Sequence, residues 1–149
     1  AGERENGYAG AMQTCIFCKI VRGEAPAHRV YEDNRVIVFL DIFPVSEGHT
    51  LVVTKQHYSD LFEADPESLQ AVATVAKKVA HALREVVRPA GLMVFQLNGS
   101  AAGQTVFHYH MHLMPRAEGE PLRLHARKPG DPEQLANLAA RLRAALENR

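Results

Sequence analysis

The stretch FHYHMHLM, residues 107–114, alternates three histidines with apolar or aromatic residues. Alternation with a period of two predicts a half-buried β-strand, because successive side chains of a strand point to opposite faces. His108, His110 and His112 should therefore share one face, about 7 Å apart at each two-residue step. The opposite face should pack into a core through Phe107, Tyr109, Met111 and Leu113. Three imidazoles in strict register serve no packing purpose, so their face is predicted to carry chemistry.

The composition predicts one globular domain. The chain has 149 residues, of which 46% are hydrophobic and 23% charged, and its formal net charge is zero. A domain of this size can bury about two thirds of its unfolded surface. Balanced charge argues against nucleic acid as the main partner, since phosphate binding requires a basic surface. No apolar run approaches the roughly 20 residues that span a bilayer, so no membrane partner is expected.

The N-terminal residues are polar and lack the apolar segment of a secretory signal. We therefore expect a cytoplasmic protein in a reducing compartment. Residues 1–14 are expected to be a disordered tail or a remnant of an expression vector, with Met12 as the native start. The single folded domain is expected to span residues 15–149.

Four short apolar or β-branched runs predict strands in addition to the histidine strand, at residues 28–31, 36–40, 49–54 and 92–97. The first three follow one another through tight turns. This favours antiparallel pairing, because parallel neighbours need a long crossover between them. The fourth precedes a small, polar loop at residues 98–105, so it should form a hairpin with the histidine strand.

Two helices carry the same N-terminal signal, Asp65-Pro66-Glu67 and Asp131-Pro132-Glu133. Aspartate caps a first turn well, proline suits the first helical position, and glutamate complements the positive end of the helix dipole. The longer helix should end before Arg88-Pro89, and its apolar stripe should comprise Leu69, Val72, Ala73, Ala76, Val79, Ala80, Leu83 and Val87. Together these elements predict an α+β fold, with about five antiparallel strands, one long helix and a C-terminal helix.

Cys15 and Cys18 form a Cys-x-x-Cys pair with three interpretations. A redox dithiol is possible, but the pair does not lie between a strand and a helix as in thioredoxin-like proteins. A structural disulfide does not suit a reducing compartment. Zinc needs about four ligands, and two histidines elsewhere could complete a tetrahedral set. Spacing alone leaves these interpretations open.

The histidine row itself has two interpretations. Imidazole is a common metal ligand, but residues i, i+2 and i+4 of a flat strand spread too widely for all three to reach one ion. A neutral imidazole nitrogen is also a nucleophile toward phosphorus, provided that the other nitrogen is held as a hydrogen-bond donor. The adjacent loop offers backbone N–H groups and the side chains of Ser100, Gln104 and Thr105 to phosphate oxygens.

The stretch at 108–114 resembles the His-φ-His-φ-His-φ-φ motif of the histidine triad (HIT) nucleotide hydrolases and transferases, where φ is a hydrophobic residue. The resemblance covers nearly all of residues 15–116. Further matching segments are Cys-Ile-Phe-Cys-Lys-Ile at 15–20, Phe-Leu-Asp-Ile at 39–42, Gly-His-Thr-Leu-Val-Val at 48–53, Asn98, and Gly-Gln-Thr-Val at 103–106.

The resemblance implies a HIT-like fold, a homodimer, and binding of a purine nucleoside monophosphate moiety. His110 would attack the α-phosphorus and form a covalent nucleotidyl-histidine, which water then hydrolyses. His112 would contact the phosphate and assist proton transfer. The remaining nucleotide contacts implied are Ile16, Phe17, Phe39 and Ile42 around the base, Asp41 on the ribose, and Asn98, Gln104 and Thr105 around the phosphate and leaving group.

In zinc-containing members of the family, the Cys-x-x-Cys pair binds Zn²⁺ together with two histidines. The resemblance therefore implies a structural zinc held by Cys15, Cys18, His49 and His108. His28, His57, His81 and His125 match no catalytic position and are expected to have surface or structural roles.

Three functions follow from the resemblance. The first is hydrolysis of a purine nucleotide conjugate such as an adenosine 5′-phosphoramidate. The second is hydrolysis of dinucleoside polyphosphates, to which Gln104 and the Pro115-Arg116 pair also point. The third is a nucleotide-binding or scaffold protein whose turnover is incidental. The sequence leaves the leaving group and the base preference open.

Overall fold

The computed structural model describes residues 12–148. The predicted tail at residues 1–14 falls mostly outside this range, and its last residues, 12–14, have helical backbone. None of the helices within 12–148 combines the length and the apolar character needed to cross a membrane.

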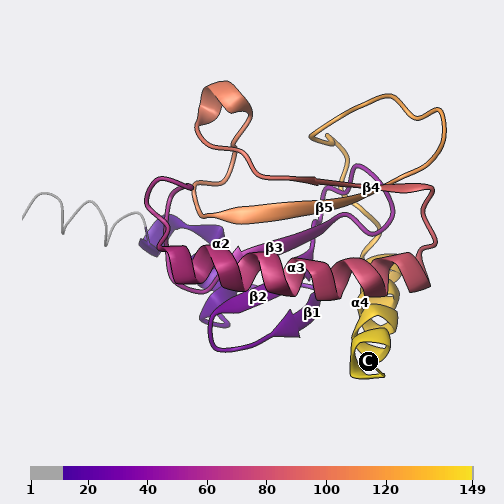
Figure 1. Ribbon diagram of the computed structural model, residues 1–149, viewed down its shortest axis with the longest axis horizontal. Helices are drawn as coiled ribbons and strands as arrows, with labels where there is room; N and C mark the ends of the chain where they lie inside the picture. Colours follow the sequence, from indigo (N-terminus) through magenta and orange to yellow (C-terminus); the bar gives the residue numbers. More distant parts are fainter. Residues whose placement is uncertain (1–11, 149) are drawn as a thin grey trace, which may run out of the picture.

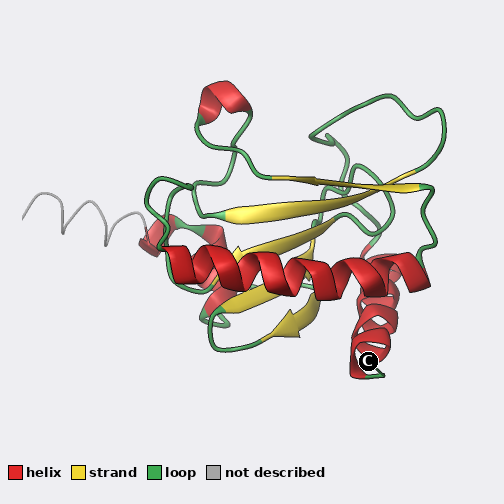
Figure 2. Cartoon of the chain, in the orientation of Figure 1, coloured by secondary structure: helices red, strands yellow, loops and turns green. Residues whose placement is uncertain are grey.

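One five-stranded antiparallel sheet organises the chain (Figures 1 and 2). Its strand order is β1-β2-β3-β5-β4, so the histidine strand β5 lies inside the sheet and β4 lies at one edge. The strands are β1 (Arg29–Glu32), β2 (Val36–Leu40), β3 (Thr50–Thr54), β4 (Gly91–Phe95) and β5 (His110–Arg116). The predicted α+β fold with five antiparallel strands is confirmed.

The helices are α2 (Ile16–Val21), α3 (Pro66–Val86) and α4 (Pro132–Glu147), with one 3₁₀ turn, η1 (Ser100–Ala102). The predicted caps lie where the sequence indicated. The Asp65 carboxylate accepts the Ser68 N–H at 2.7 Å, and Asp131 precedes α4 in the same position. The backbone N–H groups of a first helical turn have no partner within the helix, so such a carboxylate stabilises that turn.

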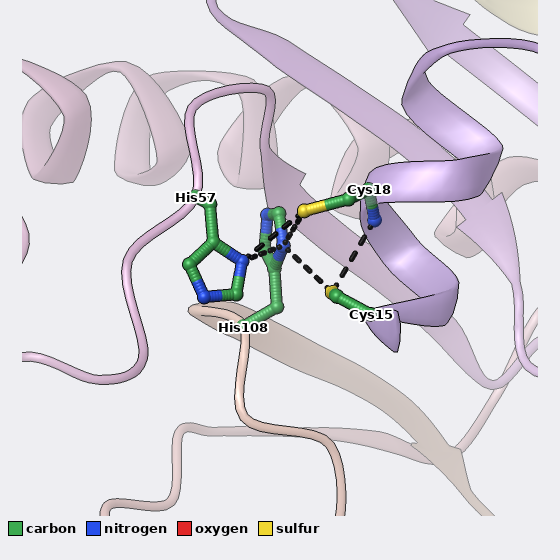
Figure 3. A group of neighbouring side chains, drawn as sticks. All are labelled: Cys15, Cys18, His57 and His108. Carbon is green, nitrogen blue, oxygen red and sulfur yellow. Dashed lines mark hydrogen bonds between the residues drawn. The ribbon is translucent and has the colours of Figure 1, made fainter. Parts of the chain in front are cut away.

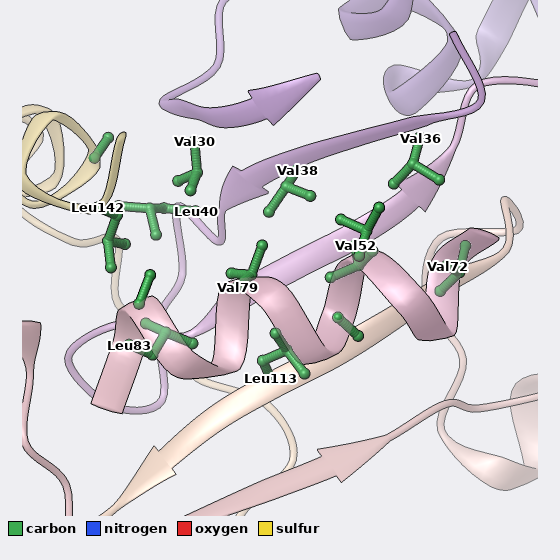
Figure 4. Close-up of a cluster of buried hydrophobic side chains, with 14 of the residues drawn as sticks. Val30, Val36, Val38, Leu40, Val52, Val72, Val79, Leu83, Leu113 and Leu142 are labelled. Atoms are coloured by element: carbon green, nitrogen blue, oxygen red, sulfur yellow. The ribbon is translucent and has the colours of Figure 1, made fainter. Parts of the chain in front are cut away.

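The main core lies between the sheet and helices α3 and α4. Val38 of β2, Val52 of β3 and Leu113 of β5 face this layer (Figure 4). The face of α3 toward the core differs slightly from the predicted stripe: Val75 and Ala82 are buried, whereas Ala73 is exposed. Alanines are poor markers of a helix face, because a small side chain is tolerated on either side.

The opposite sheet face is covered by α2. A smaller cluster there joins Phe17 and Ile20 of α2 to Ile37, Phe39 and Leu51 of the sheet. Because residues directly opposite each other in an antiparallel pair share a face, the pairs Leu51–His112 and Val53–His110 put both histidines on this side. The site therefore lies between the sheet and α2, away from the main core.

The histidine strand is shorter at its start than the sequence predicts. β5 begins at His110, and Phe107 is 47% exposed rather than buried in the core. Tyr109 is buried as expected and donates its N–H to the Tyr58 carbonyl at 2.7 Å. The prediction of three histidines on one strand was wrong for His108, which precedes the strand and is free to turn elsewhere.

Candidate functional site

His110 is held in one tautomer by the backbone of its own segment. Its Nδ1 lies 2.6 Å from the carbonyl oxygen of His108. A carbonyl only accepts hydrogen bonds, so Nδ1 carries the proton and Nε2 keeps its lone pair. Burial lowers the pKa of His110, which favours the neutral ring. The backbone group that fixes this tautomer, left open by the sequence, is therefore the carbonyl two residues earlier.

A second hydrogen-bond chain sets the tautomer of His112. The Val45 N–H donates to Nδ1 of His49 at 3.2 Å, so the proton of the neutral His49 ring is on Nε2. That Nε2–H faces Nδ1 of His112 at 2.9 Å. His112 then carries its own proton on Nε2, and its ring stacks on Phe95 with centroids 4.3 Å apart. The chain therefore presents a hydrogen-bond donor beside the His110 nucleophile.

Asp41, His49 and His112 also lie close enough to share a metal ion. The tautomers argue against it, because the lone pair of His49 is already used by the Val45 N–H. A metal bound to Nε2 of His49 would force the ring proton onto Nδ1, and this proton would clash with the Val45 N–H. The arrangement is better described as a proton-bearing chain than as a metal site.

Acid should destabilise the protein through His49 and His112. Burial, as the largest cause, lowers the pKa of His49 to about 4 and of His112 to about 2, against 6.5 for an ordinary histidine. As pH falls below about 6.5 the unfolded chain takes up these protons first, so folded-state stability is lost. Between pH 7.5 and 5 we expect the pair to cost about 2–4 kcal/mol.

Urea unfolding at both pH values measures this effect. Between pH 7.5 and 5, the double variant His49→Gln/His112→Gln should lose about 2–4 kcal/mol less stability than the wild type. His81→Gln, on the exposed side of α3, is the control and should behave as wild type. An equal acid loss in all three proteins would contradict the assignment.

A cavity of about 500 Å³ opens in front of His110 and His112. This is the size of a small-molecule site, and most of its lining is apolar. Seven of the residues predicted to contact a nucleotide line this cavity: Ile16, Phe17, Phe39, Asp41, Ile42, Thr105 and His112.

Asp41 lies at the polar end of this lining. Its Oδ1 accepts the Phe43 N–H at 2.9 Å, and its Oδ2 lies 3.7 Å from Nε2 of His49. Burial raises the pKa of Asp41, and hydrogen bonding to Phe43 partly opposes this. The bond to Phe43 fixes the direction of the carboxylate.

Two predicted nucleotide residues, Asn98 and Gln104, are not part of the cavity lining. Asn98 accepts the Leu61 N–H at 2.8 Å, and the buried Gln104 amide accepts the Gly99 N–H and donates to the Ser59 carbonyl, both at 2.7 Å. These bonds hold the 98–105 loop against the 59–63 turn. Direct contact of either side chain with a nucleotide stays a prediction.

Cys15, Cys18, His57 and His108 form a second cluster near the start of β5 (Figure 3). His49 was predicted in place of His57, and this prediction was wrong, because His57 is the residue that joins the two cysteines and His108. β3 and β5 are antiparallel, so the end of β3, not its start, adjoins the residues that precede β5. His57 follows the end of β3, whereas His49 precedes its start and meets His112.

This cluster has the donor set and the dimensions of a zinc site. Tetrahedral zinc with bonds of about 2.0–2.3 Å keeps its ligand atoms about 3.3–3.8 Å apart. Nδ1 of His108 lies 3.3 Å from Sγ of Cys15, 3.5 Å from Sγ of Cys18 and 3.2 Å from Nδ1 of His57. Nε2 of His108 donates to the Thr54 carbonyl at 2.6 Å, so its Nδ1 lone pair points into the cluster.

Zinc ligation by Cys18 would require its thiolate form. Burial and the neighbouring Cys15 raise the pKa of the Cys18 thiol to about 12. A thiolate there requires a positive charge nearby, which a divalent metal supplies. Both cysteines are free of disulfides. The residues present therefore fit a structural zinc.

Comparison with known proteins identifies the family. The protein-family model described as the HIT domain matches residues 22–119. The chain belongs to the HIT family. This confirms the resemblance drawn from the histidine stretch, and it places the chain in a family of nucleotide-binding hydrolases.

Individual HIT proteins support the same assignment. Protein hit of Bacillus subtilis (strain 168) is 46% identical over 104 residues, which are 70% of this chain and 72% of that protein. Adenylylsulfatase HINT3 of Arabidopsis thaliana is 42% identical over an alignment 123 positions long, which covers 76% of this chain and 61% of that protein. A crystal structure of a zinc-bound histidine triad family protein from Mycobacterium smegmatis matches with a TM-score of 0.81 and 40% identity, covering 92% of this chain and 96% of that one.

Proposed function

We propose that this protein hydrolyses purine nucleotide conjugates, such as an adenosine 5′-phosphoramidate, through a covalent nucleotidyl-histidine on His110. The observation that carries the proposal is the bond from Nδ1–H of His110 to the His108 carbonyl, which leaves the Nε2 lone pair free beside the cavity. A neutral imidazole with one nitrogen held as a donor is suited to attack phosphorus. The ring is largely buried, which keeps it neutral and excludes water around it.

Two displacements complete the reaction. Nε2 of His110 forms a bond to the α-phosphorus while the bond to the leaving group breaks. Nε2–H of His112 donates a hydrogen bond to the departing atom, and the leaving group takes its proton from solvent. Water then attacks the phosphorus, the P–N bond to His110 breaks, and the water proton is released to solvent. AMP and the protonated leaving group are the products.

The apolar cavity would hold the nucleoside. Ile16, Phe17 and Phe39 would contact the base, and the Asp41 carboxylate would accept hydrogen bonds from the ribose hydroxyls. The zinc would be held by Cys15, Cys18, His57 and His108 and would act structurally, since all four positions are protein ligands.

Intact-protein mass spectrometry tests the proposal. Wild-type protein mixed briefly with adenosine 5′-phosphoramidate should gain one adenylate, and His110→Ala should gain none. Free AMP should accumulate only with the wild type. Absence of both adduct and turnover in the wild type would overturn the proposal for this class of substrate.

Sulfate is the leaving group favoured by a specific comparison. The Arabidopsis relative is an adenylylsulfatase by name, and it is 42% identical to this chain. Adenosine 5′-phosphosulfate therefore belongs beside the phosphoramidate in the substrate panel, with a dinucleoside polyphosphate as the third member. A protein that binds AMP but turns over none of the three would act as a nucleotide-binding or scaffold protein.

We further propose that the protein is a homodimer joined at β4. This strand is at the edge of the sheet, and Leu92 and Val94 on it are 36% and 51% exposed. An apolar edge with unpaired backbone groups favours pairing with another strand. Light scattering should give twice the mass of the chain, and Val94→Lys should give a monomer. A monomeric wild type at micromolar concentration would contradict the proposal.

A further inference from the structure

The segment at residues 117–130, which we call the strap, connects β5 to α4 and loops out beyond the sheet (Figure 1). It is tied down at both ends. The Arg116 guanidinium donates to the carbonyls of Glu120 and Pro121 at 2.9 and 3.0 Å. At the other end, the Gly130 N–H donates to the carbonyl of Ile42 at 2.8 Å, and Ile42 directly follows Asp41 in the sequence.

The middle of the strap reaches the cavity. Leu124, His125 and Ala126 line it together with His110 and His112. Nε2–H of His125 donates to the Gly103 carbonyl at 2.8 Å, which links the strap to the 98–105 loop. A Cβ on Gly103 would lie 3.4 Å from that nitrogen, so loop and strap approach closely. The 98–105 loop precedes β5 in the sequence and the strap follows it, and the two thus meet at the rim of the cavity.

The cavity has little positive charge of its own. Among the described residues that line it, none is lysine or arginine. Burial keeps His110 and His112 neutral, while His125 is exposed to solvent. Burial is the main influence on the pKa of Asp41, His110 and His112, and His125 is close enough to all three to act on them electrostatically as well.

The geometry of in-line displacement indicates where the leaving group lies relative to His125. The leaving group departs on the side of the phosphorus opposite the attacking nitrogen of His110. His110 is largely buried at the inner wall, whereas His125 is exposed at the rim. The leaving group should therefore point toward the rim, where His125 lies.

We propose that His125 determines leaving-group specificity: its imidazolium binds an anionic leaving group, sulfate or phosphate, and favours such substrates over those that release a neutral amine. This proposal rests on the proposed function, since it assigns a substrate class to the same site. An ionised donor on an anionic oxygen forms a stronger bond than a neutral donor does.

Steady-state kinetics with adenosine 5′-phosphosulfate and adenosine 5′-phosphoramidate test the proposal. His125→Gln keeps an N–H for the Gly103 carbonyl but loses the charge. Its kcat/KM should fall about tenfold or more with the phosphosulfate and stay within about twofold with the phosphoramidate. His125→Arg retains a charge and should retain the preference. Arg123→Ala removes an exposed charge from the same strap outside the cavity and should change neither value.

The outcomes separate the two proposals. Equal losses with both substrates in His125→Gln would assign the strap a purely structural role and overturn the specificity proposal. No change with either substrate would also overturn it. If the wild type turns over neither substrate, the proposed function fails, and the specificity proposal fails with it.

Discussion

Replacing His110 with glycine will lower the turnover of adenosine 5′-phosphoramidate by a factor of about 10⁴ or more. The loss is large because Nε2 of His110 makes the first bond to phosphorus, and no other described side chain offers an equivalent lone pair at that place. His112 cannot replace it, since the bond from His49 puts the His112 proton on Nε2. Steady-state AMP release measures the effect.

Added imidazole provides a sharp control for this variant. Glycine leaves a space where the ring packed against Phe17, whose centroid lies 5.0 Å from that of His110. Free imidazole should enter this space and restore part of the turnover. His81 lies within α3, where glycine would destabilise the helix. His81→Ala therefore serves as the matched histidine control and should keep full activity. Retention of more than a tenth of wild-type activity in His110→Gly would exclude nucleophilic catalysis by this residue.

Removing the proposed zinc will lower both stability and activity. We expect chelation, or His57→Ala, to reduce the free energy of unfolding by about 3 kcal/mol or more, which is about 6–12 °C in Tm for a chain of this size. The cluster joins α2, the turn after β3 and the residue before β5, so losing it frees three segments at once. Calorimetry and metal analysis by mass spectrometry measure the two effects.

Loss of the proposed zinc should also lower activity, because His108 contributes both to the cluster and to the position of His110. Its ring belongs to the cluster, and its carbonyl holds Nδ1 of His110. Release of the ring would loosen that carbonyl and lower kcat more than it raises KM. His49→Ala is the matched control: it should keep one zinc per chain, whereas His57→Ala should lose it. Zinc retained in His57→Ala but lost in His49→Ala would falsify the ligand set.

Much of the fold could be read from local pattern. The apolar runs at 36–40 and 49–54 contain β2 and β3, and the two Asp-Pro-Glu signals marked the starts of α3 and α4. Local pattern suffices there because capping, proline geometry and side-chain alternation act over a few residues. The histidine stretch likewise indicated that His110 and His112 share a face, which the pairing with β3 bears out.

The partners of each histidine depended on tertiary structure. His49 and His57 are eight positions apart and both flank β3. Which of them approaches the cysteines follows from the direction of β3 relative to β5, and no local pattern carries that direction. A signal was available in principle, because antiparallel pairing puts the end of one strand beside the start of the other.

The chain by itself therefore determined the two long helices, the approximate positions of the five strands, the shared face of His110 and His112, and the family. Only the tertiary structure decided that His57 joins Cys15, Cys18 and His108, that the His108 carbonyl fixes His110, and that His125 reaches the rim of the cavity. The physical reason is that alternation and capping are properties of neighbouring residues. Metal ligation, tautomer choice and cavity lining require groups from distant segments to meet within hydrogen-bonding distance, which the packing of the whole sheet decides.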